Sequence, residues 1–426
     1  MADGLIRMLA WPGMTEPSPA AAPRRAAIAF IFVTVMLDML ALGMIIPVLP
    51  ELIKNFRGGD TAAAAATLGT FGTAWALMQF FASPVLGSLS DHFGRRKIIL
   101  LSNFGLGVDY IFMAVSPTLA WLFVGRLISG VTAASIPTAF AYIADVTPVE
   151  KRAKSFGILG AAFGIGFVVG PVIGGLLGGY GPRMPFWVSA GFSLANAMYG
   201  LFVLPESLTA EHRAAFSWKR ANPIGSLSLL SRHPQLLGFA SVHFLYFLAH
   251  QSLQNVFVLY ADYRYHWDTR MVGLCLGAVG VSFMIVQGGL VGRIVATFGE
   301  RRTMLTGLAA GVTGFLIYGL APTGAAFMMG VPIMAFLGLY GPSAQGLMTR
   351  RVGKSEQGRL QGALTSVSSI TGIVGPTLFS LVFAAVIGSA RDWHLPGAPF
   401  ILASMLLVVA LVIAWRITLV RPQPQT

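Results

Sequence analysis

The sequence predicts an all-α polytopic membrane protein, with twelve transmembrane helices arranged as two six-helix bundles. Of its 426 residues, 55% are hydrophobic and only 11% are charged, whereas a soluble domain carries about 25% charged residues. The apolar runs are long enough to cross a bilayer as helices, which takes about 20 residues. They are also continuous, unlike the alternating strands of a β-barrel. A polar stretch over residues 205–235 separates six such runs from six more.

The predicted spans follow one another with short connections. They are expected at 26–49, 64–90, 97–117, 119–142, 153–179, 184–204, 236–260, 271–297, 302–321, 325–348, 359–389 and 397–418. The chain therefore divides into a cytoplasmic N-terminal tail (1–25), an N-terminal bundle (26–204), a cytoplasmic linker (205–235), a C-terminal bundle (236–418) and a cytoplasmic C-terminal tail (419–426). The first tail is rich in proline and ends in two arginines, so it does not have the pattern of a secretory signal.

The basic residues gather on one side of this topology. The net charge is +13, and of the 29 Lys and Arg residues 22 fall in the tails, the linker and the connections on the same side, six on the other side, and Arg126 within a span. Cytoplasmic connections of membrane proteins are enriched in Lys and Arg. Both termini are therefore predicted in the cytoplasm, with the chain in the inner membrane. The basic excess is a topology signal, and no nucleic-acid partner is expected.

Several function classes lack their sequence signature. Cys275 is the single cysteine, which excludes an internal disulfide, and neither a Cys/His metal spacing nor a phosphate-binding loop is present. We therefore expect no metal site, no cofactor and no ATP-driven step. An intramembrane enzyme would need a clustered nucleophile, base or metal, and a sensor would usually add a soluble output domain. Neither pattern is found.

The two halves share a repeat at an offset of 205 residues. The matched positions are Gly87 and Gly292, Gly94 and Gly299, Arg96 and Arg301, Pro137 and Pro342, Gly157 and Gly362, and Gly170-Pro171 and Gly375-Pro376. Each half has an even number of spans, so both run the same way through the membrane. Transporters built from such parallel repeats hold substrate near the midplane, between the halves.

Three ionisable side chains fall inside predicted spans. Asp38 lies in the middle of the first, Asp109 near the centre of the third, and Arg126 about a third of the way along the fourth. A charge at the bilayer centre costs roughly 2.5–3.5 kcal/mol on insertion scales, so such residues usually move a proton, an ion or a substrate. A structural ion pair with another span is the alternative for Asp109 and Arg126. These charges favour transport as the function.

Uncharged polar residues are candidates for a substrate site. Gln79 in the second span is equally well explained as a substrate ligand or as a link between helices. The seventh span holds His243, His250, Gln251 and Gln254, and both histidines share a helix face with Gln254. Histidine titrates near neutral pH and can relay protons. A hydrogen-bonded structural histidine is the alternative at either position.

The connection after the second span combines glycine, an acid and arginines. It contains Gly87, Asp91, Gly94, Arg95 and Arg96. Glycine allows a tight turn, and a carboxylate among guanidinium groups forms charge-assisted bonds, so we predict a cytoplasmic gate. A basic loop with an incidental acid is the alternative. Asp145, at the cytoplasmic end of the fourth span, is assigned to the same gate, with a capping or loop role left open.

The fifth span is rich in glycine at helical spacing. Gly166, Gly170 and Gly174 recur every four residues, and so share a face that allows close backbone approach. Pro171 removes a helical hydrogen bond and permits a kink. We predict a hinge here and at the repeat-related Gly375-Pro376, with small-residue packing as the other interpretation.

Short stretches on both halves together carry a resemblance to a known family. They are the Gly87–Lys97 loop, the Gly-Pro run of the fifth span, Leu37-Asp38, Pro47–Pro50, Ala76–Gln79, Val108–Tyr110, Gly125–Leu127 with Gly130, Ile143–Asp145, Tyr265–Asp268, Gly299–Arg302 and Gln361-Gly362. The pattern resembles the major facilitator superfamily, drug/proton antiporter type, and within it the tetracycline efflux branch. The resemblance implies the major facilitator fold, whose two bundles rock around a central site.

The resemblance also implies roles for individual residues. Asp38 and Asp109 would lie on the path of the proton and a cationic drug. Gln79 would touch substrate, and Asp91 with Arg95 would form the gate. Arg126 would be the buried positive charge that helps to set proton affinity.

Two departures from the branch concern the second half. The branch carries an acid in the ninth span, where this chain has Ala310 or Gly311, and a histidine in the eighth, where Phe283 stands. Coupling is therefore expected to rest on the first half, and the cargo to be cationic or zwitterionic and amphipathic.

The expected function is proton-coupled antiport. A monomer in the lipid bilayer would export a small drug-like molecule by alternating access, and protons would be its other partner. Whether tetracycline itself is a substrate is left open. The proton gradient is the energy source, and arrival of the substrate as a metal chelate is left open. A uniporter or symporter of the same fold for a metabolite, such as a sugar or an organic anion, is the alternative.

Overall fold

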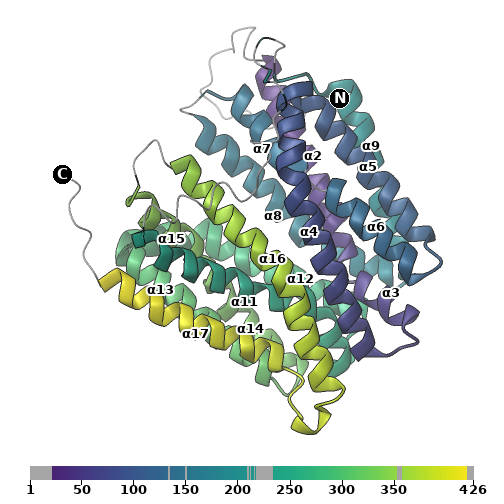
Figure 1. Ribbon diagram of the computed structural model, residues 1–426, viewed down its shortest axis with the longest axis vertical. Helices are drawn as coiled ribbons and strands as arrows, with labels where there is room; N and C mark the ends of the chain where they lie inside the picture. The colour runs from purple at the N-terminus through teal and green to yellow at the C-terminus, as the bar shows by residue number, and fades with distance from the viewer. Residues whose placement is uncertain are drawn as a thin grey trace.

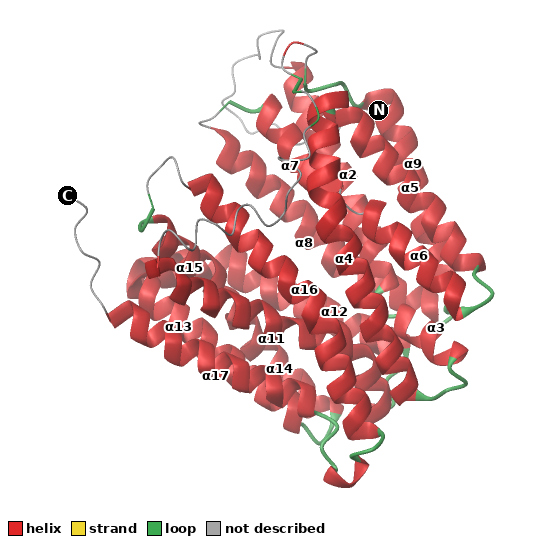
Figure 2. Cartoon of the chain, viewed as in Figure 1, coloured by secondary structure: helices red, strands yellow, loops and turns green. Residues whose placement is uncertain are grey.

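The computed structural model describes residues 22–132, 135–148, 151–208, 211, 213–214, 216, 234–352 and 357–419 (Figure 1). These residues form helices joined by short turns, and no strand occurs among them (Figure 2). Most of the predicted N-terminal tail and linker, and nearly all of the predicted C-terminal tail, lie outside the described residues. The first helix begins at Ala22, four residues before the expected start of the first span.

The first half contains eight helical segments that make the first six predicted spans. They are α2 (Ala22–Ile45), α3 (Leu49–Phe56), α4 (Thr61–Phe93), α5 (Arg95–Val115), α6 (Leu119–Thr132), α7 (Ser135–Val146), α8 (Arg152–Gly178) and α9 (Met184–Val203). The first span is broken between α2 and α3 at a turn that contains Pro47, where proline supplies no backbone N–H.

The second half is more irregular. Its segments are α11 (Pro234–Tyr265), α12 (Thr269–Ile285), the π-helix η4 (Val286–Leu290), α13 (Val291–Leu320), α14 (Gly324–Ala335), the 3-10 helix η5 (Phe336–Leu339), α15 (Tyr340–Thr349), α16 (Gln357–Ile387), the 3-10 turn η7 (Arg391–Trp393) and α17 (Ala398–Leu419). The tenth span is thus two α-helices joined by one 3-10 turn.

The twelve predicted spans are all accounted for among these segments. Ten stretches of the described residues are long and apolar enough to cross a membrane. One of them, Thr269–Leu320, has 52 residues, about 78 Å of helix, which is more than twice the bilayer core. It turns back at Gly299 (φ 75°, ψ 161°) and so holds the eighth and ninth spans. The remaining span is α4, which has 33 residues and interrupts its apolar run with threonines and Gln79.

The two halves form two bundles that meet along paired helices (Figure 1). Within the first bundle α2 packs on α8 and α5 on α9; within the second, α11 packs on α16 and α17. Between the bundles α4 lies against α16, and α8 lies against α12. The second and fifth spans therefore contact the eleventh and eighth, and the seam between the two halves runs along these four helices.

The repeat appears in backbone conformation as well as in sequence. Gly94 between α4 and α5 has φ 103°, and Gly299, its match at an offset of 205 residues, has φ 75°. Both values lie in the region that favours glycine. Pro171 and Pro376, also matched, both lie inside long helices, α8 and α16.

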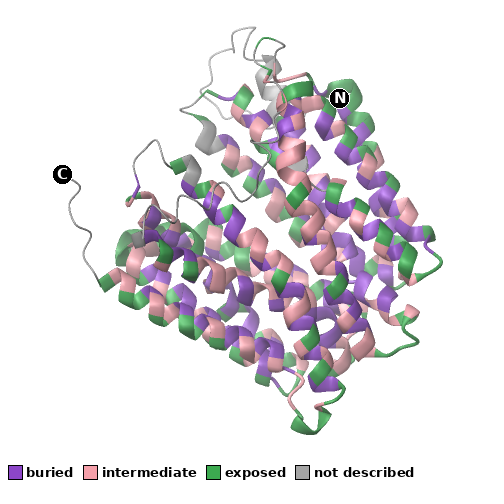
Figure 3. Cartoon of the chain, in the orientation of Figure 1, coloured by how far each residue is buried: buried purple, intermediate pink, exposed green. Residues whose placement is uncertain are grey.

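Exposed residues lie on the outer surface of the bundles, whereas buried residues line the contacts between helices (Figure 3). Many of the exposed side chains are large and apolar. Phe202 and Met329 are 78% and 69% exposed, and large apolar side chains such as Leu101 and Trp121 are also exposed. Contiguous apolar surface of this extent is rare on soluble proteins. Together with the long apolar helices, it defines a multi-pass membrane protein whose outer face contacts lipid.

Candidate functional site

The carboxylate of Asp38 is buried between α2 and α9. Its side chain is 6% exposed, and Asn196 of α9 donates its side-chain amide to the Asp38 carboxylate at 3.1 Å. The same amide donates to the Thr34 carbonyl, one turn earlier on α2, at 3.2 Å. Asn196 therefore fixes the carboxylate against the helix that carries it, without contributing a charge. No motif in the sequence marks Asn196 as part of this site.

Asp109 and Arg126 form a second buried pair of charges. Asp109 on α5 is 1% exposed, and neither of its carboxylate oxygens has a hydrogen-bond partner among the described residues. Arg126 on α6 attracts it electrostatically, and the guanidinium carbon of Arg126 lies 5.5 Å from the centre of the Trp75 ring on α4. A neighbouring span thus supplies a positive charge near this carboxyl group, and a third span covers that charge with an aromatic ring.

Tyr110 joins these groups into one electrostatic neighbourhood. Its buried hydroxyl interacts with the charges of Asp109, Arg126 and Asp38. The three ionisable residues predicted from the sequence are therefore brought together in the first bundle. Tyr110 lies in one of the stretches that carry the family resemblance, but the resemblance implies no role for it.

Gln79 lies close to this neighbourhood along α4. It is half-buried and follows Trp75 by four residues, which places both side chains on the same helix face. Because the Arg126 guanidinium lies over the Trp75 ring, Gln79 is one turn along α4 from a residue that contacts a buried charge. This placement suits a substrate contact and equally suits a link between helices.

The two histidines of the seventh span, His243 and His250, have different neighbours. His243 on α11 lies 3.1 Å from the Ser368 hydroxyl of α16, and the His250 ring is nearly parallel to Tyr246 at 6.3 Å. A cavity of about 290 Å³ is lined by His243, Tyr246, Phe247, Gly341, Pro342, Gln345 and Met348. The second bundle therefore offers an aromatic wall with one histidine.

The two glutamines of the seventh span, Gln251 and Gln254, differ in their surroundings. Gln251 accepts a hydrogen bond from Asn255 at 3.1 Å, and a Cβ added at Gly375 would lie 2.5 Å from the Gln251 side chain. Gln254 is exposed. Gln251 thus packs directly against the predicted hinge position of α16.

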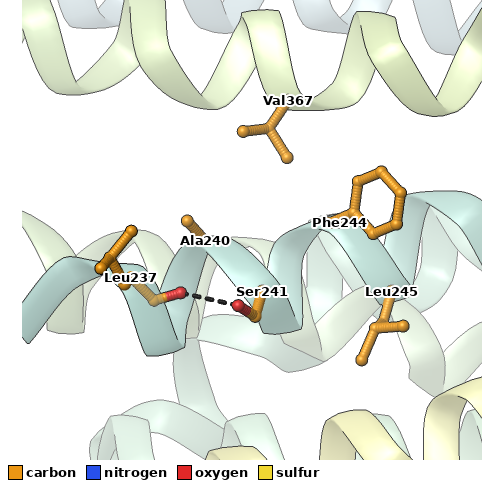
Figure 4. A pocket seen from close by; sticks show the side chains of 6 residues that line it. All are labelled: Leu237, Ala240, Ser241, Phe244, Leu245 and Val367. Carbon is orange, nitrogen blue, oxygen red and sulfur yellow. Dashed lines mark hydrogen bonds between the residues drawn. The ribbon is translucent and has the colours of Figure 1, made fainter. Parts of the chain in front are cut away.

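A second cavity lies between α11 and α16 (Figure 4). It measures about 350 Å³ and is lined by Leu237, Ala240, Ser241, Phe244, Leu245 and Val367. Its one hydroxyl, that of Ser241, donates to the Leu237 carbonyl of its own helix at 2.9 Å. None of the predicted site residues lines this cavity, and its wall is suited only to apolar groups.

The two positions at which the chain departs from the tetracycline branch differ in burial: Gly311 is buried, whereas Phe283 is exposed. A Cβ added at Gly311 of α13 would lie 2.6 Å from Leu337 and 2.7 Å from Leu407, so an acidic side chain has no room there. Phe283 of α12 packs against Gly338. At Gly311, one of the two positions that align with the acid of the branch, the second half therefore provides no space for an acidic side chain.

The predicted gate residues form an ion-pair network on the first bundle. Arg95 pairs with Asp91 at 2.5 Å and with Asp145 at 3.2 Å, and donates to the Ser90 hydroxyl at 2.6 Å. Gly94 supplies the turn with its positive φ. Arg95 thereby ties the connection between α4 and α5 to the end of α7.

Glu206 lies next to this network, and no motif in the sequence marks it as part of the gate. The Glu206 carboxylate, just after α9, accepts from the backbone N–H of Arg95 at 2.8 Å and also from Ser207 N–H at 3.1 Å. It therefore caps the first turn of α5, where the helix dipole favours a negative charge. Arg96 donates to the Leu201 carbonyl of α9 at 2.7 Å, whereas no atom lies within 4 Å of a Cβ added at Gly87.

The second bundle carries an ion pair at the repeat-related positions, with the charges reversed. Glu300 accepts from Arg350 at 2.8 Å. At an offset of 205 residues, Glu300 corresponds to Arg95 and Arg350 to Asp145. In both bundles an ion pair therefore joins the turn between two spans to the end of the span that follows them. In the second bundle the acid and the base have exchanged places.

The glycine face of α8 packs against α2 within the first bundle. A Cβ at Gly170 would lie 2.8 Å from the Cα of Gly43, and one at Gly166 would lie 2.6 Å from Met39. Gly174 faces the backbone of Met44. On the adjoining face, Pro171 and Gly175 contact Gly273 of α12 in the other bundle. Small-residue packing is therefore present at this position, and its use as a hinge stays a prediction.

Metal ligands do not gather in this site. Among the residues that the structure describes, no group of three or more His, Cys, Asp or Glu side chains is placed to hold a metal ion. The buried carboxylates are accordingly described by their polar and charged neighbours alone.

The fold, the apolar outer face and the buried charges together define a membrane transporter of the two-bundle type. The family model that describes the Major Facilitator Superfamily matches residues 31–376 and 290–426, and the chain belongs to that superfamily. Its members are transporters rather than enzymes, so the substrate class is a small molecule. The resemblance predicted from the motifs is thus confirmed for the family.

Individual relatives agree with the predicted branch. The chain is 36% identical over 388 residues to the tetracycline resistance protein, class C, from Escherichia coli, covering 90% of this chain and 95% of that protein. It is 35% identical to the class G protein from Vibrio anguillarum, covering 87% and 93%. Among solved structures, the human organic anion transporter MFSD10 (TETRAN) matches with a TM-score of 0.68 and 24% identity, covering 92% of this chain and 99% of that one. This last likeness concerns the fold alone.

Proposed function

We propose that the protein is a proton-coupled antiporter that exports small amphipathic drug-like molecules across the inner membrane, with both termini in the cytoplasm. The observation that carries this proposal is the neighbourhood of Asp38, Asp109 and Arg126 in the first bundle. One buried carboxyl group there, that of Asp38, accepts a hydrogen bond from an amide of another span. The other, that of Asp109, is attracted by the guanidinium group of Arg126 on a neighbouring span. Protonation of these carboxyls and binding of a cationic group compete for the same negative charge, which is what an exchange of protons for substrate requires.

The cargo follows from the same groups. Carboxylates attract a cation, while aromatic side chains such as Trp75 and Tyr246 supply the apolar surface that ligand sites need. Cationic or zwitterionic compounds with several rings combine both properties. The names of the relatives, tetracycline resistance proteins of classes C and G, support the same class of cargo. We therefore propose tetracycline-like and other multi-ring compounds, with weaker tetracycline resistance than the branch would suggest because no acid fits at Gly311.

The proposed cycle uses alternating access. Substrate enters from the cytoplasm while Asp38 and Asp109 are ionised, and protons arriving from the other side displace it after the bundles have rocked. The ion pairs of Arg95 with Asp91 and Asp145 act as the cytoplasmic latch. The protein works as a monomer, since each chain contains both halves of the site.

The test measures export and its energy source together. Drug-sensitive cells that express the protein should show raised inhibitory concentrations for multi-ring compounds, and a protonophore should abolish the protection. Purified protein in liposomes should move protons when such a compound is added. Asp38→Asn should remove both effects, whereas Asp392→Asn, a change to an exposed acid of η7, should remove neither. Proton-coupled movement of a sugar or an anionic metabolite, with no protection against any drug, would instead support the symporter alternative.

A further inference from the structure

At the membrane end opposite to Arg95 and Asp145, the bundles contact each other, and several of these contacts are between uncharged groups. Thr73 of α4 donates to the Ile373 carbonyl of α16 at 2.7 Å and lies 2.8 Å from the Thr377 hydroxyl. Gly175 of α8 approaches Gly273 of α12 at 3.0 Å for an added Cβ. When alternating access opens this end, water can replace each of these contacts, and no charged group loses its partner.

One contact at this end is different in kind. Lys54 of α3 pairs with Asp262 of α11, and this is the one ion pair between the bundles among the described residues. The two side chains are 26% and 36% exposed, so the pair is only partly solvated. Since α3 belongs to the first bundle and α11 to the second, the pair must break whenever this end of the interface opens.

A second carboxylate lies within reach of the same ammonium group. Glu51 precedes Lys54 by three residues on α3, which places the two side chains on one helix face. One Glu51 carboxylate oxygen is buried and has no hydrogen-bond partner among the described residues. Lys54 attracts this carboxylate, whereas Asp262 and Asp268 of the second bundle repel it. One lysine therefore stands between a carboxylate of its own bundle and one of the opposite bundle.

We infer that Lys54 exchanges Asp262 for Glu51 when the bundles separate at this end, so that the two acids stabilise opposite conformations of the transport cycle. The inference rests on the alternating access of the proposed function. A partly buried ammonium group that loses its partner is destabilised, and a carboxylate one turn away on the same helix removes most of that cost. Separation also takes Glu51 away from the repulsion of Asp262. Asp262 thus favours the closed end, and Glu51 favours the open end.

The experiment measures the opening of this end directly. Spin labels at Asn55→Cys and Arg391→Cys, both exposed positions on the two bundles, report the distance between them in the full-length protein, and Cys275 is buried. Asp262→Asn should shift the distribution toward longer distances, and Glu51→Gln toward shorter ones. The ratio of the two populations should change about two- to fivefold, as for partly exposed ion pairs. Asp60→Asn, at the same end and still able to cap α4, should leave the distribution unchanged.

Opposite directions for the two variants are the decisive result. If both variants shift the distribution the same way, or neither shifts it, the inference is overturned. If Glu51→Gln fails to fold, Glu51→Asp takes its place. Because this variant keeps the charge, it should show the wild-type distance distribution. The readout needs no substrate, so it separates the two proposals. Opposite shifts without drug export would support the exchange of partners by Lys54 and contradict the proposed cargo. Drug export without opposite shifts would support the proposed cargo and contradict the exchange.

Discussion

Asn196 of α9 donates one side-chain amide both to the carboxylate of Asp38, at 3.1 Å, and to the backbone carbonyl of Thr34, at 3.2 Å. The two acceptors lie one turn apart on α2, so a single amide fixes the direction of the carboxyl group relative to its own helix. An amide carries no charge and therefore orients Asp38 without neutralising it. For the proton uptake and release that we propose for Asp38, an uncharged partner is better suited than a permanent cation.

This relationship gives the first prediction. Asn196→Ala should leave substrate affinity within a few-fold of wild type but slow proton-driven turnover, because Asp38 loses its fixed direction. Losing the partner of a buried polar group also costs about 1–3 kcal/mol of stability. Transport rate and equilibrium binding in liposomes under a pH gradient measure the two effects. Ser189→Ala is the matched control, since Ser189 also ties α9 to α2, through the Ala41 carbonyl at 2.9 Å, but contacts no charge. If the two variants turn over at the same rate, Asn196 has no special role.

The second prediction concerns Glu206, whose carboxylate caps the start of α5. Glu206→Gln keeps the shape of the side chain but removes its charge from the helix N-terminus, which should cost about 0.3–1 kcal/mol. Since α5 begins at Arg95, the variant should also loosen the latch and lower turnover. Thermal unfolding in detergent and transport rate test the two parts. Glu211→Gln is the control, because Glu211 lies in the same connection and is exposed. An unchanged melting temperature and rate would remove Glu206 from the gate.

The third prediction separates packing from hinge motion in α8. Gly170→Ala places a Cβ 2.8 Å from the Gly43 backbone, and overpacking of this kind typically costs 1–3 kcal/mol. Gly160→Ala on the same helix meets no atom within 4 Å, and alanine is the better helix former by about 1 kcal/mol. We expect a lower melting temperature only for Gly170→Ala. A stable Gly170→Ala variant that no longer transports would favour the hinge over the packing interpretation.

The sequence could predict those parts of the fold that depend on long one-dimensional patterns. Continuous apolar runs give the spans, and Asp38 and Asp109 stand out because a charge in such a run is costly. Contacts between distant segments could not be predicted in this way. Glu206 reaches Arg95 across 111 residues, and Lys54 reaches Asp262 across 208; no local pattern marks either pair. The π-helix after α12 is likewise set by packing, where Gln287 donates to the Gly338 carbonyl at 2.9 Å.

The last prediction uses the reversed ion pair of the second bundle. Glu300 and Arg350 occupy the positions that match Arg95 and Asp145, so the same backbone accepts either order of charges. Arg95→Glu alone should slow turnover strongly, because it places three acids together with Asp91 and Asp145. The double variant R95E/D145R should recover part of the rate by restoring one pair, although the bond of Arg95 to Asp91 stays lost. In the second bundle, E300R/R350E should recover more fully, since no third charged partner contacts Glu300 among the described residues.

Transport rates of R95E, R95E/D145R, E300R and E300R/R350E in liposomes decide this prediction, with substrate binding measured separately. Binding should change little throughout, because neither pair lies near the buried carboxylates. A larger recovery in the second bundle than in the first would support a latch in which Arg95 serves two acids and Glu300 serves one base. Equal rates for each single and its double variant would mean that these ion pairs are solvated surface contacts, worth less than about 1 kcal/mol, and that the latch must be sought elsewhere on the cytoplasmic side.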